Sequence, residues 1–222
     1  MSRKPAHSRY QPATGAEGES EPGSRGRVLR NKPGIQRKRE MDHAEFEALI
    51  RAQSDFLGRV TTETQFTADT LRSMHRAWQG ELYEWAGEYR TVEMEKGGFR
   101  WPPAHLVAQN MAALEQGLLR QHTPCRQASL DTVARRMAEV HAELLLIHPF
   151  RDGNGRLARW LADLMALQAG WPLPQYVFAG PGSRRERAHY IEAVTQGYLT
   201  RYELLTDFFR AAVERRLRAQ GD

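Results

Sequence analysis

One short segment, residues 148–159, constrains this chain more than any other, because it must form a tight loop between two helices. It reads His-Pro-Phe-Arg-Asp-Gly-Asn-Gly-Arg-Leu-Ala-Arg. Before it, residues 130–147 carry apolar side chains at three- and four-residue spacings, which predicts an amphipathic or largely buried helix. After the loop, residues 156–168 resume a helical pattern that ends at Gly170 and Pro172. The sequence therefore predicts a helix, a loop and a second helix.

The side chains of this segment are those that a protein uses to handle a nucleotide phosphate. Pro149 stops the first helix and restricts how His148 projects, and a histidine can accept a proton from a hydroxyl near neutral pH. Asp152 offers a carboxylate to Mg²⁺, a cation that prefers carboxylate and phosphate oxygens. Arg156 and Arg159, three residues apart in the second helix, can present their guanidinium groups to the same phosphates.

The glycine-rich part of the segment predicts a cradle for an anion. Gly153, Asn154 and Gly155 allow positive φ angles and a close approach of the backbone. A loop of this kind that leads into a helix points backbone N–H groups at an anion. Each feature alone has a plainer explanation, since a Gly-Asn-Gly run is commonly a turn and Phe150 is interpreted as a core residue. The joint occurrence at fixed offsets favours a functional site.

The segment resembles, at every position, the signature of the Fic family, His-x-Phe-x-Asp/Glu-Gly-Asn-Gly-Arg-x-x-Arg. The resemblance implies a mainly α fold, a Fic-type helical bundle with a short β-hairpin flap. It also implies the transfer of AMP from ATP to a Ser, Thr or Tyr hydroxyl of a target protein. In that reaction His148 is the general base, and residues 152–159 bind the phosphates of ATP and its Mg²⁺.

Other functions remain open. The related Doc branch phosphorylates its target and carries Ala-Asn-Lys at positions 153–155, so Gly155 and Arg156 favour adenylylation over a kinase. Some members with the same signature use other nucleotides or phosphocholine. A third possibility is a catalytically silent regulatory protein that binds partners through a basic tail. The presence of His148, Arg156 and Arg159 argues against it.

Two further segments resemble the family less specifically. Residues 71–85 have helical spacing, and residues 88–103 are predicted to form two short strands around a glycine turn. In the family, a hairpin at this place is the flap that aligns the target segment by strand addition, which works for any side chain. An ordinary hairpin is the alternative. Within a helical pattern at 183–198, Tyr190 resembles a position near the adenine, although it can also be a packed core tyrosine. The predicted flap residues are Lys96, Gly97, Gly98 and Phe99.

Composition divides the chain into a basic extension, residues 1–40, and a Fic domain, residues 41–222, with a core of about 65–200. The first 40 residues hold ten Lys or Arg against four Glu, whereas the rest of the chain holds 22 basic and 23 acidic residues. Residues 2–26 are rich in Ser, Gly, Pro and Glu, which predicts a largely disordered segment. Residues 25–40 could touch nucleic acid or an acidic partner, but nucleic acid is not expected as a direct substrate.

The sequence predicts a cytoplasmic protein without a membrane partner. A single cysteine, Cys125, rules out an internal disulfide framework and fits a reducing compartment. The chain has no run of 18 apolar residues and its N-terminus lacks the apolar stretch of a signal peptide. ATP and Mg²⁺ are available in the compartment that this indicates.

The resemblance also bears on regulation. Fic proteins are commonly restrained by a helix with Ser/Thr-x-x-x-Glu-Gly/Asn, whose glutamate pairs with the last signature arginine, here Arg159. The only Ser or Thr with a glutamate four residues later is Thr91, before Glu95, and that pair lies in the predicted flap and is followed by Lys96. The chain is therefore either unrestrained or restrained by a glutamate helix from a separate, small antitoxin-like protein. We expect the second arrangement.

Overall fold

The computed structural model describes residues 16–221, which divide into two compact units, each assembled from separate chain segments. The predicted domain at 41–222 is therefore divided between the two units, and each is described by itself. Of the described residues, the first unit takes 16–58, 68–111 and 147–154, and the second takes 59–67, 112–146 and 155–221.

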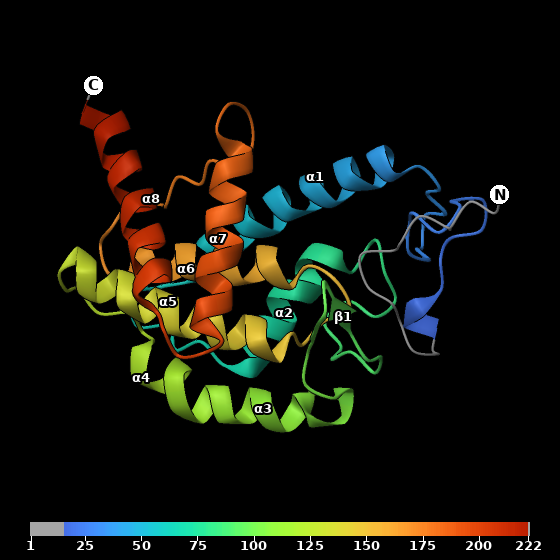
Figure 1. Cartoon of the computed structure of the whole chain (residues 1–222), viewed down its shortest axis with the longest axis horizontal. Coiled ribbons are helices and arrows are strands. Elements are labelled where there is room, and N and C mark those ends of the chain that lie inside the picture. Colours follow the sequence, from blue (N-terminus) through green and yellow to red (C-terminus); the bar gives the residue numbers. More distant parts are fainter. Residues whose placement is uncertain (1–15, 222) are drawn as a thin grey trace. The chain divides into compact units, whose positions relative to one another are not determined.

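Two packed helices form the core of the first unit. Helices α1 (Lys38–Leu57) and α2 (Ala68–Gln79) contact each other (Figure 1). Tyr83, beyond the end of α2, is tied to α1 because its hydroxyl donates a hydrogen bond of 2.7 Å to Oε1 of the buried Glu45. The helices bury one face each, because their apolar residues recur every three or four positions. The buried apolar residues are Met41, Ala48, Ala52 and Phe56 in α1, and Leu71, Met74 and Trp78 in α2.

Helix α2 is shorter than the helical spacing of residues 71–85 predicts. It ends at Gln79, and a Cβ atom added at Gly80 would lie 2.5 Å from the carbonyl oxygen of Arg76, so only glycine fits there. The N–H groups of Leu82 and Tyr83 both donate to the carbonyl oxygen of Gln79. Residues 82–85 therefore form turns whose apolar side chains continue the helical spacing without the helix.

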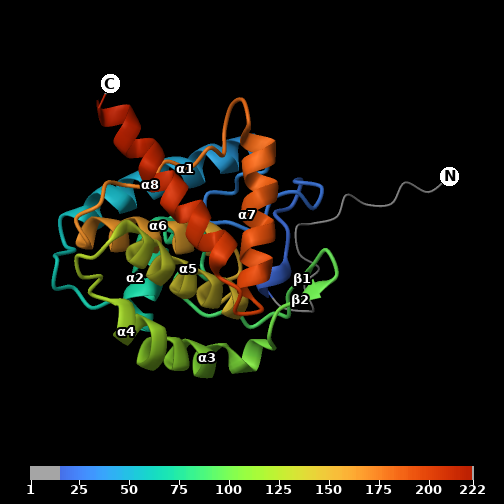
Figure 2. The same cartoon turned by 60° about the vertical axis from the view of Figure 1, so that its left-hand side comes forward.

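The predicted hairpin is confirmed, and it is short. Strands β1 (Glu95–Lys96) and β2 (Phe99–Arg100) pair antiparallel, with Lys96 opposite Phe99 (Figure 2). Gly97 and Gly98 have φ angles of 59° and 83°. Positive φ at both central residues is the geometry of the two-residue turn that suits the twist of a hairpin. A short 3₁₀ turn (Ala104–Leu106) and helix α3 (Val107–Leu114) follow.

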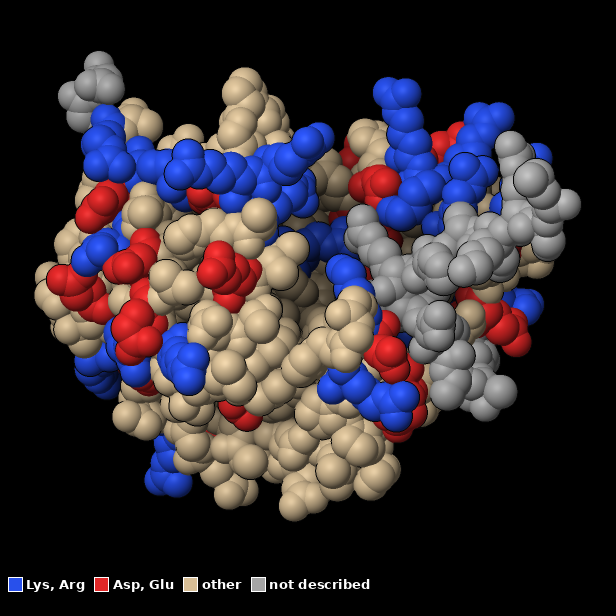
Figure 3. Space-filling model, in the orientation of Figure 1, with Lys and Arg blue, Asp and Glu red and all other residues tan. Residues whose placement is uncertain are grey.

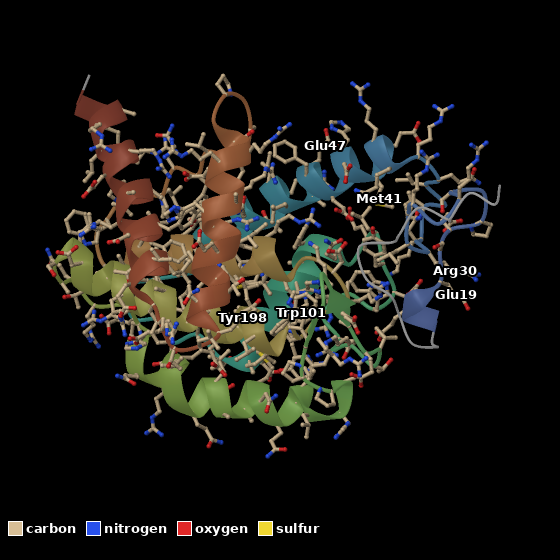
Figure 4. All side chains as sticks on the ribbon, in the orientation of Figure 1. Glu19, Arg30, Met41, Glu47, Trp101 and Tyr198 are labelled. Carbon is tan, nitrogen blue, oxygen red and sulfur yellow. The ribbon has the colours of Figure 1, made fainter. Side chains whose placement is uncertain are left out.

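The N-terminal segment differs from the disordered extension that the sequence predicts, as far as the structure describes it. Residues 2–15 lie outside the described residues, but a 3₁₀ turn (Ala16–Gly18) begins an ordered stretch in which Ser24 and Val28 are buried. Glu19 and Arg30, labelled in Figure 4, form an ion pair at 2.9 Å. The physical reason for the order is local pairing, because backbone N–H groups on each arm donate to carbonyls on the other.

The second unit is helical. A π-helical turn (Glu115–Leu119) leads into the short helix α4 (Arg120–His122). Helices α5 (Leu130–Ile147) and α6 (Asn154–Gln168) follow along the chain. Helix α7 (Ser183–Gly197) packs against α8 (Glu203–Gly221). The helices predicted around the motif are confirmed, and so is the mainly α class with a hairpin. No helix among residues 16–221 combines the length and the apolar character needed to cross a membrane.

The single cysteine of the chain lies in the core of the second unit. Cys125 is fully buried, and burial raises the pKa of its thiol, which makes it an inert core residue.

Exposed arginines gather on α7 and α8, where Figure 3 shows a row of basic side chains, so basic residues are not confined to the N-terminal segment. They include Arg184, Arg185, Arg187 and Arg218.

Candidate functional site

The loop that follows α5 begins with a strained residue. Helix α5 ends at Ile147, and His148 has a φ of 52°, in the left-handed region that costs a non-glycine residue free energy. Pro149 explains why the helix stops here, because proline disfavours the right-handed helical conformation at the residue before it. His148 is only 6% exposed. The predicted base is therefore enclosed by neighbours that fix its backbone.

The side chain of Asn154 closes the loop. Its Oδ1 accepts a hydrogen bond from the N–H of Phe150 at 2.9 Å, and its Nδ2 donates to the carbonyl oxygen of Phe150 at 2.7 Å. The same residue is buried and begins α6. Because both polar atoms of the side chain are used inside the loop, the main-chain N–H is the group that Asn154 can offer to an anion.

The fold requires glycine at position 153 of the motif but not at position 155. Gly153 has a φ of 84°, and a Cβ there would lie 2.7 Å from the Trp78 ring, so both the backbone and the packing require glycine. Gly155 lies in the first turn of α6, and a Cβ there would meet its nearest atom, Nη1 of Arg159, at an ordinary 3.5 Å. The structure of the loop therefore explains Gly153 and leaves Gly155 free for a ligand role.

His75 of α2 anchors the loop, a role that the sequence analysis missed. Its Nδ1 accepts a hydrogen bond of 2.8 Å from the N–H of Gly87, so in the neutral ring Nε2 carries the proton and donates to the carbonyl oxygen of Asp152 at 3.1 Å. The ring stacks on Phe150 with centroids 4.0 Å apart. The only signal in the sequence was a histidine among apolar residues at helical spacing, which is typical of a core position.

Asp152 keeps one carboxylate oxygen for a ligand. Its Oδ1 accepts a hydrogen bond of 2.7 Å from the N–H of Gly153, and Oδ2 makes none with any residue in the described part of the chain. Among residues 16–221, no group of three or more His, Cys, Asp or Glu side chains could hold a metal ion by itself. A single carboxylate that shares Mg²⁺ with phosphate oxygens is a common arrangement. Asp152 therefore fits a magnesium ion that arrives with a nucleotide.

A buried arginine, Arg90, holds the start of this loop to the base of the hairpin. Its Nε donates to the carbonyl oxygen of His148 at 2.7 Å, and its own N–H donates to that of Pro149 at 2.8 Å. The guanidinium also donates to the carbonyl oxygens of Val92 at 2.9 Å and Pro102 at 2.6 Å. Burial lowers the pKa of Arg90, but an arginine stays charged at neutral pH. The sequence alone does not distinguish this arginine from the others.

The predicted flap residues stand at the exposed tip of the hairpin, and its base is buried. Lys96, Gly97 and Gly98 are exposed, and Phe99 is 36% exposed. Trp101, labelled in Figure 4, packs with Val92 and Met94 at the base of the hairpin. Its indole ring lies 4.1 Å from the imidazole of His148, centroid to centroid. The hairpin thus contacts the predicted base directly.

The ordered N-terminal segment also reaches this loop. Arg151 is 2% exposed, and its Nε donates to the carbonyl oxygen of Glu17 at 2.7 Å. The carboxylate of Glu17 accepts a hydrogen bond of 3.1 Å from the N–H of Thr91, next to Arg90. The segment that the sequence assigned to a solvated extension therefore supports the loop.

In the second unit, Arg159 of α6 is held by aromatic groups. Its Nη1 donates to the hydroxyl of Tyr190 at 3.2 Å, and the guanidinium lies over the rings of Phe178 and Tyr190, at 4.9 and 5.4 Å. Tyr190 also bonds to Nε2 of His141 at 2.8 Å. Arg159 forms no ion pair with any residue that the structure describes. Its charge therefore remains available to an anion.

Two buried groups near Arg159 have strongly shifted pKa values. Burial, with a contribution from Arg159, lowers the pKa of His141 to about 3, so its ring is neutral at physiological pH. Burial raises the pKa of Asp163 to about 7, although the Tyr176 hydroxyl donates a hydrogen bond of 2.8 Å to it. Both shifts follow from the cost of a charge in a poorly solvated place.

The structure therefore distributes the predicted site residues over the two units. His148, Asp152, Gly153 and Asn154 share the first unit with the flap, and Gly155, Arg156, Arg159 and Tyr190 belong to the second. Arg156 is partly exposed in the first turn of α6. Tyr190 contacts Arg159 and His141, which gives its hydroxyl a local role besides the predicted place near an adenine.

Comparison with known proteins gives the family. The Fic/DOC family model matches residues 65–166, a range that holds both the hairpin and the whole motif. Residues 65–166 of the chain therefore match the Fic/DOC family. Its fold is also similar to those of two Bartonella effector proteins. They are BepC from Bartonella tribocorum with bound AMPPNP (TM-score 0.67, 24% identity, 83% of this chain and 91% of that one) and Bep8 from Bartonella sp. 1-1C (TM-score 0.70, 20% identity, 84% and 90%).

Two sequence relatives are named adenylyltransferases. The protein adenylyltransferase VbhT of Bartonella schoenbuchensis is 27% identical over 184 residues, which cover 82% of this chain and 36% of VbhT. The probable protein adenylyltransferase Fic of Salmonella typhimurium is 28% identical over 147 residues, or 66% of this chain and 71% of that protein. The matched part of this chain thus spans about a third of the first relative and most of the second.

The two glycines give a test of the loop. We expect Gly153→Ala to lower the free energy of unfolding by about 1–3 kcal/mol, because alanine is strained at this φ and collides with Trp78. Gly155→Ala is the matched control. It should change stability by less than about 1 kcal/mol, because alanine favours a helix. Urea denaturation followed by circular dichroism measures both, and equal losses would contradict the distinction.

Asp163 and His141 should give opposite pH dependences of stability. The folded state keeps a proton on Asp163 between its ordinary pKa of 3.8 and about 7, where the unfolded state releases it, so stability falls as pH rises. The lowered pKa of His141 makes the unfolded state the protonated one between about 3 and 6.5, so stability rises with pH. In the pH range where both groups act, the loss of stability from Asp163 and the gain from His141 nearly cancel.

Asp163→Asn should uncover the dependence of His141 while an amide oxygen still accepts the Tyr176 hydrogen bond. The free energy of unfolding of the variant should then rise more steeply with pH than that of the parent, by up to about 1.4 kcal/mol per unit between about pH 4 and 6.5. Asp131→Asn, at an exposed carboxylate of α5, is the control. Parallel stability curves for Asp163→Asn and the parent would refute the assignment.

Proposed function

We propose that this chain is a protein adenylyltransferase, which transfers AMP from ATP to a Ser, Thr or Tyr hydroxyl of a target protein. The observation that carries the proposal is the complete twelve-residue motif, from His148 to Arg159, placed between the end of α5 and the first turns of α6. The names of the relatives support the same activity. The setting we propose is the cytoplasm, where ATP is available.

In this reaction His148 takes the proton from the target hydroxyl while the hydroxyl oxygen attacks the α-phosphorus of ATP. A new bond forms between that oxygen and phosphorus, the bond from the α-phosphorus to the bridging oxygen breaks, and pyrophosphate leaves. The strained, buried backbone of His148 supports this role, because fixed neighbours hold the ring in one place. The proton ends on the imidazole.

The phosphates are assigned to the loop and to α6. Main-chain N–H groups at Asn154 and Gly155, with the guanidinium groups of Arg156 and Arg159, bind phosphate oxygens, while the N–H of Gly153 donates to Asp152 and positions its carboxylate. A magnesium ion on Asp152 would neutralise phosphate charge, and the unbonded Oδ2 supports that position. Tyr190 holds Arg159 in place through its hydroxyl.

The flap, Lys96 to Phe99, is assigned to the target protein. Its strands are two residues long and exposed, so the hairpin can take an extended target segment as an added strand. Main-chain hydrogen bonds of this kind recognise a conformation and leave the identity of the target to other contacts.

The first prediction on function concerns the donor. With ATP labelled at the α position and a cell lysate as acceptor, we expect protein-bound label, and none with ATP labelled at the γ position. Label from the γ position alone would identify the kinase alternative. Absence of both labels would point to another donor, such as a phosphocholine or a different nucleotide.

His148→Ala should lower this transfer by about 10²- to 10⁴-fold, the usual effect of removing a general base. ATP binding, measured by calorimetry, should be retained because His148 contacts no phosphate in this assignment. His43→Ala, at an exposed histidine of α1, is the control. Transfer by His148→Ala within a few-fold of the parent would reject the role of the base.

We also infer that a separate small protein restrains the enzyme with a glutamate. The one Ser/Thr-x-x-x-Glu run of the chain lies in the hairpin, where Glu95 pairs with Arg100 at 3.2 Å. Arg159, in contrast, keeps a charge without a carboxylate partner in the described part of the chain. A glutamate from a partner could meet it and occupy the place of a phosphate.

The test is expression of the chain alone and together with the product of a neighbouring small reading frame. Self-modification with α-labelled ATP should be strong for the chain alone and suppressed on co-expression. Arg159→Lys should escape suppression, because lysine cannot make a bidentate contact with a carboxylate. A chain that is inactive alone, and is activated by replacing one of its own glutamates, would disprove this inference.

A further inference from the structure

His148 is held in a conformation that its own backbone does not favour. A non-glycine residue in the left-handed region is strained, so neighbouring contacts must stabilise it. Contacts to its carbonyl group and to its ring come from residues 90–101, the segment that carries the hairpin. This segment contains the proposed flap.

Arg90 fixes the main chain on both sides of His148. Its guanidinium donates to the carbonyl oxygens of His148 and, at 3.4 Å, Ile147, while its main-chain N–H donates to that of Pro149. The same guanidinium binds carbonyl oxygens on both arms of the hairpin. One rigid, planar group therefore ties the hairpin to the loop, a geometry that lysine cannot reproduce.

Trp101 fixes the ring of His148. The two rings are 4.1 Å apart between centroids and inclined by 36°, and the residues are only 7% and 6% exposed. Trp101 belongs to the hairpin because its N–H donates to the carbonyl oxygen of Met94 at 3.1 Å. On its other side, the exposed Phe99 of β2 packs edge-on at 5.3 Å. The indole thus lies between the flap and the imidazole.

We propose that Arg90 and Trp101 are positioning residues for His148, Arg90 through the main chain and Trp101 through the ring. The flap then has two tasks, since the element assigned to the target also orients the group that removes the target's proton. The expected effect on catalysis rests on the proposed function. The positioning of His148 itself rests on the geometry of the first unit alone.

The decisive variants are Trp101→Leu, which keeps apolar volume and removes the ring, and Trp101→Phe, which keeps an aromatic face. With α-labelled ATP, Trp101→Leu should lower kcat by about 10- to 100-fold, because a displaced base loses its alignment. KM and Kd for ATP should stay unchanged. Trp101→Phe should restore most of kcat. Trp171→Leu, at a tryptophan of the second unit, is the matched control.

A second readout does not depend on activity. In the parent, the indole ring should shift the NMR signals of the His148 ring protons, and Trp101→Leu should abolish that shift. Unchanged His148 signals overturn the proposal, even if the parent transfers no AMP. If the shift of the His148 signals is lost in Trp101→Leu, the positioning of His148 by Trp101 is supported whether or not the chain transfers AMP. Failure of the proposed function is therefore recognised separately. If Trp101→Leu does not fold, Trp101→Met fills the space without a ring and takes its place.

Arg90→Lys tests the main-chain contact. Lysine keeps the charge and loses the forked arrangement of N–H donors, so we expect a lower kcat with the same KM for ATP. The control is Arg76→Lys, at an exposed arginine of the same unit, and it should change neither kcat nor KM. A kcat within about twofold of the parent in Trp101→Leu, or an equal loss of ATP affinity and kcat, overturns the proposal.

Discussion

The first unit depends on a buried positive charge that is bound by backbone and not by a carboxylate. Arg90 is 2% exposed, and the partners of its guanidinium are carbonyl oxygens from both arms of a hairpin and from a loop nearly 60 residues further along the chain. A buried charge is costly unless its donors are satisfied. Because carbonyl groups are fixed to the main chain, satisfying this guanidinium also fixes three backbone segments. Removing it would leave several buried carbonyls unpaired.

The loop itself is stabilised by short-range closure and by one long-range anchor. Asn154 closes it with two hydrogen bonds to Phe150, and His75 holds the carbonyl of Asp152 while stacking on Phe150. These contacts use side chains to order main-chain atoms. The result leaves the N–H groups of the following turn and one oxygen of Asp152 for a ligand, which is the preorganisation that phosphate transfer requires.

The sequence predicted those parts whose causes are local. Helices α5 and α6 and the turn at Gly97 follow from apolar spacing, proline and glycine, which act within a few residues. The roles of Arg90 and His75 could not be predicted, because their hydrogen-bond partners are main-chain groups that carry no mark in the sequence. The site residues of the motif were predicted from their offsets, and their roles in binding and transfer stay predictions. The order in the described part of the N-terminal segment comes from pairing between backbone groups, which a polar composition does not reveal.

Aromatic groups hold Arg159 in place without an ion pair from the described part of the chain. The guanidinium lies over the rings of Phe178 and Tyr190 and donates to the Tyr190 hydroxyl, which also bonds to the buried, neutral His141. An internal carboxylate would neutralise Arg159 and compete with a phosphate, whereas aromatic faces orient the group and leave its remaining N–H donors to an anion. If a glutamate of another protein pairs with Arg159 as proposed, that carboxylate and a phosphate would compete for one guanidinium.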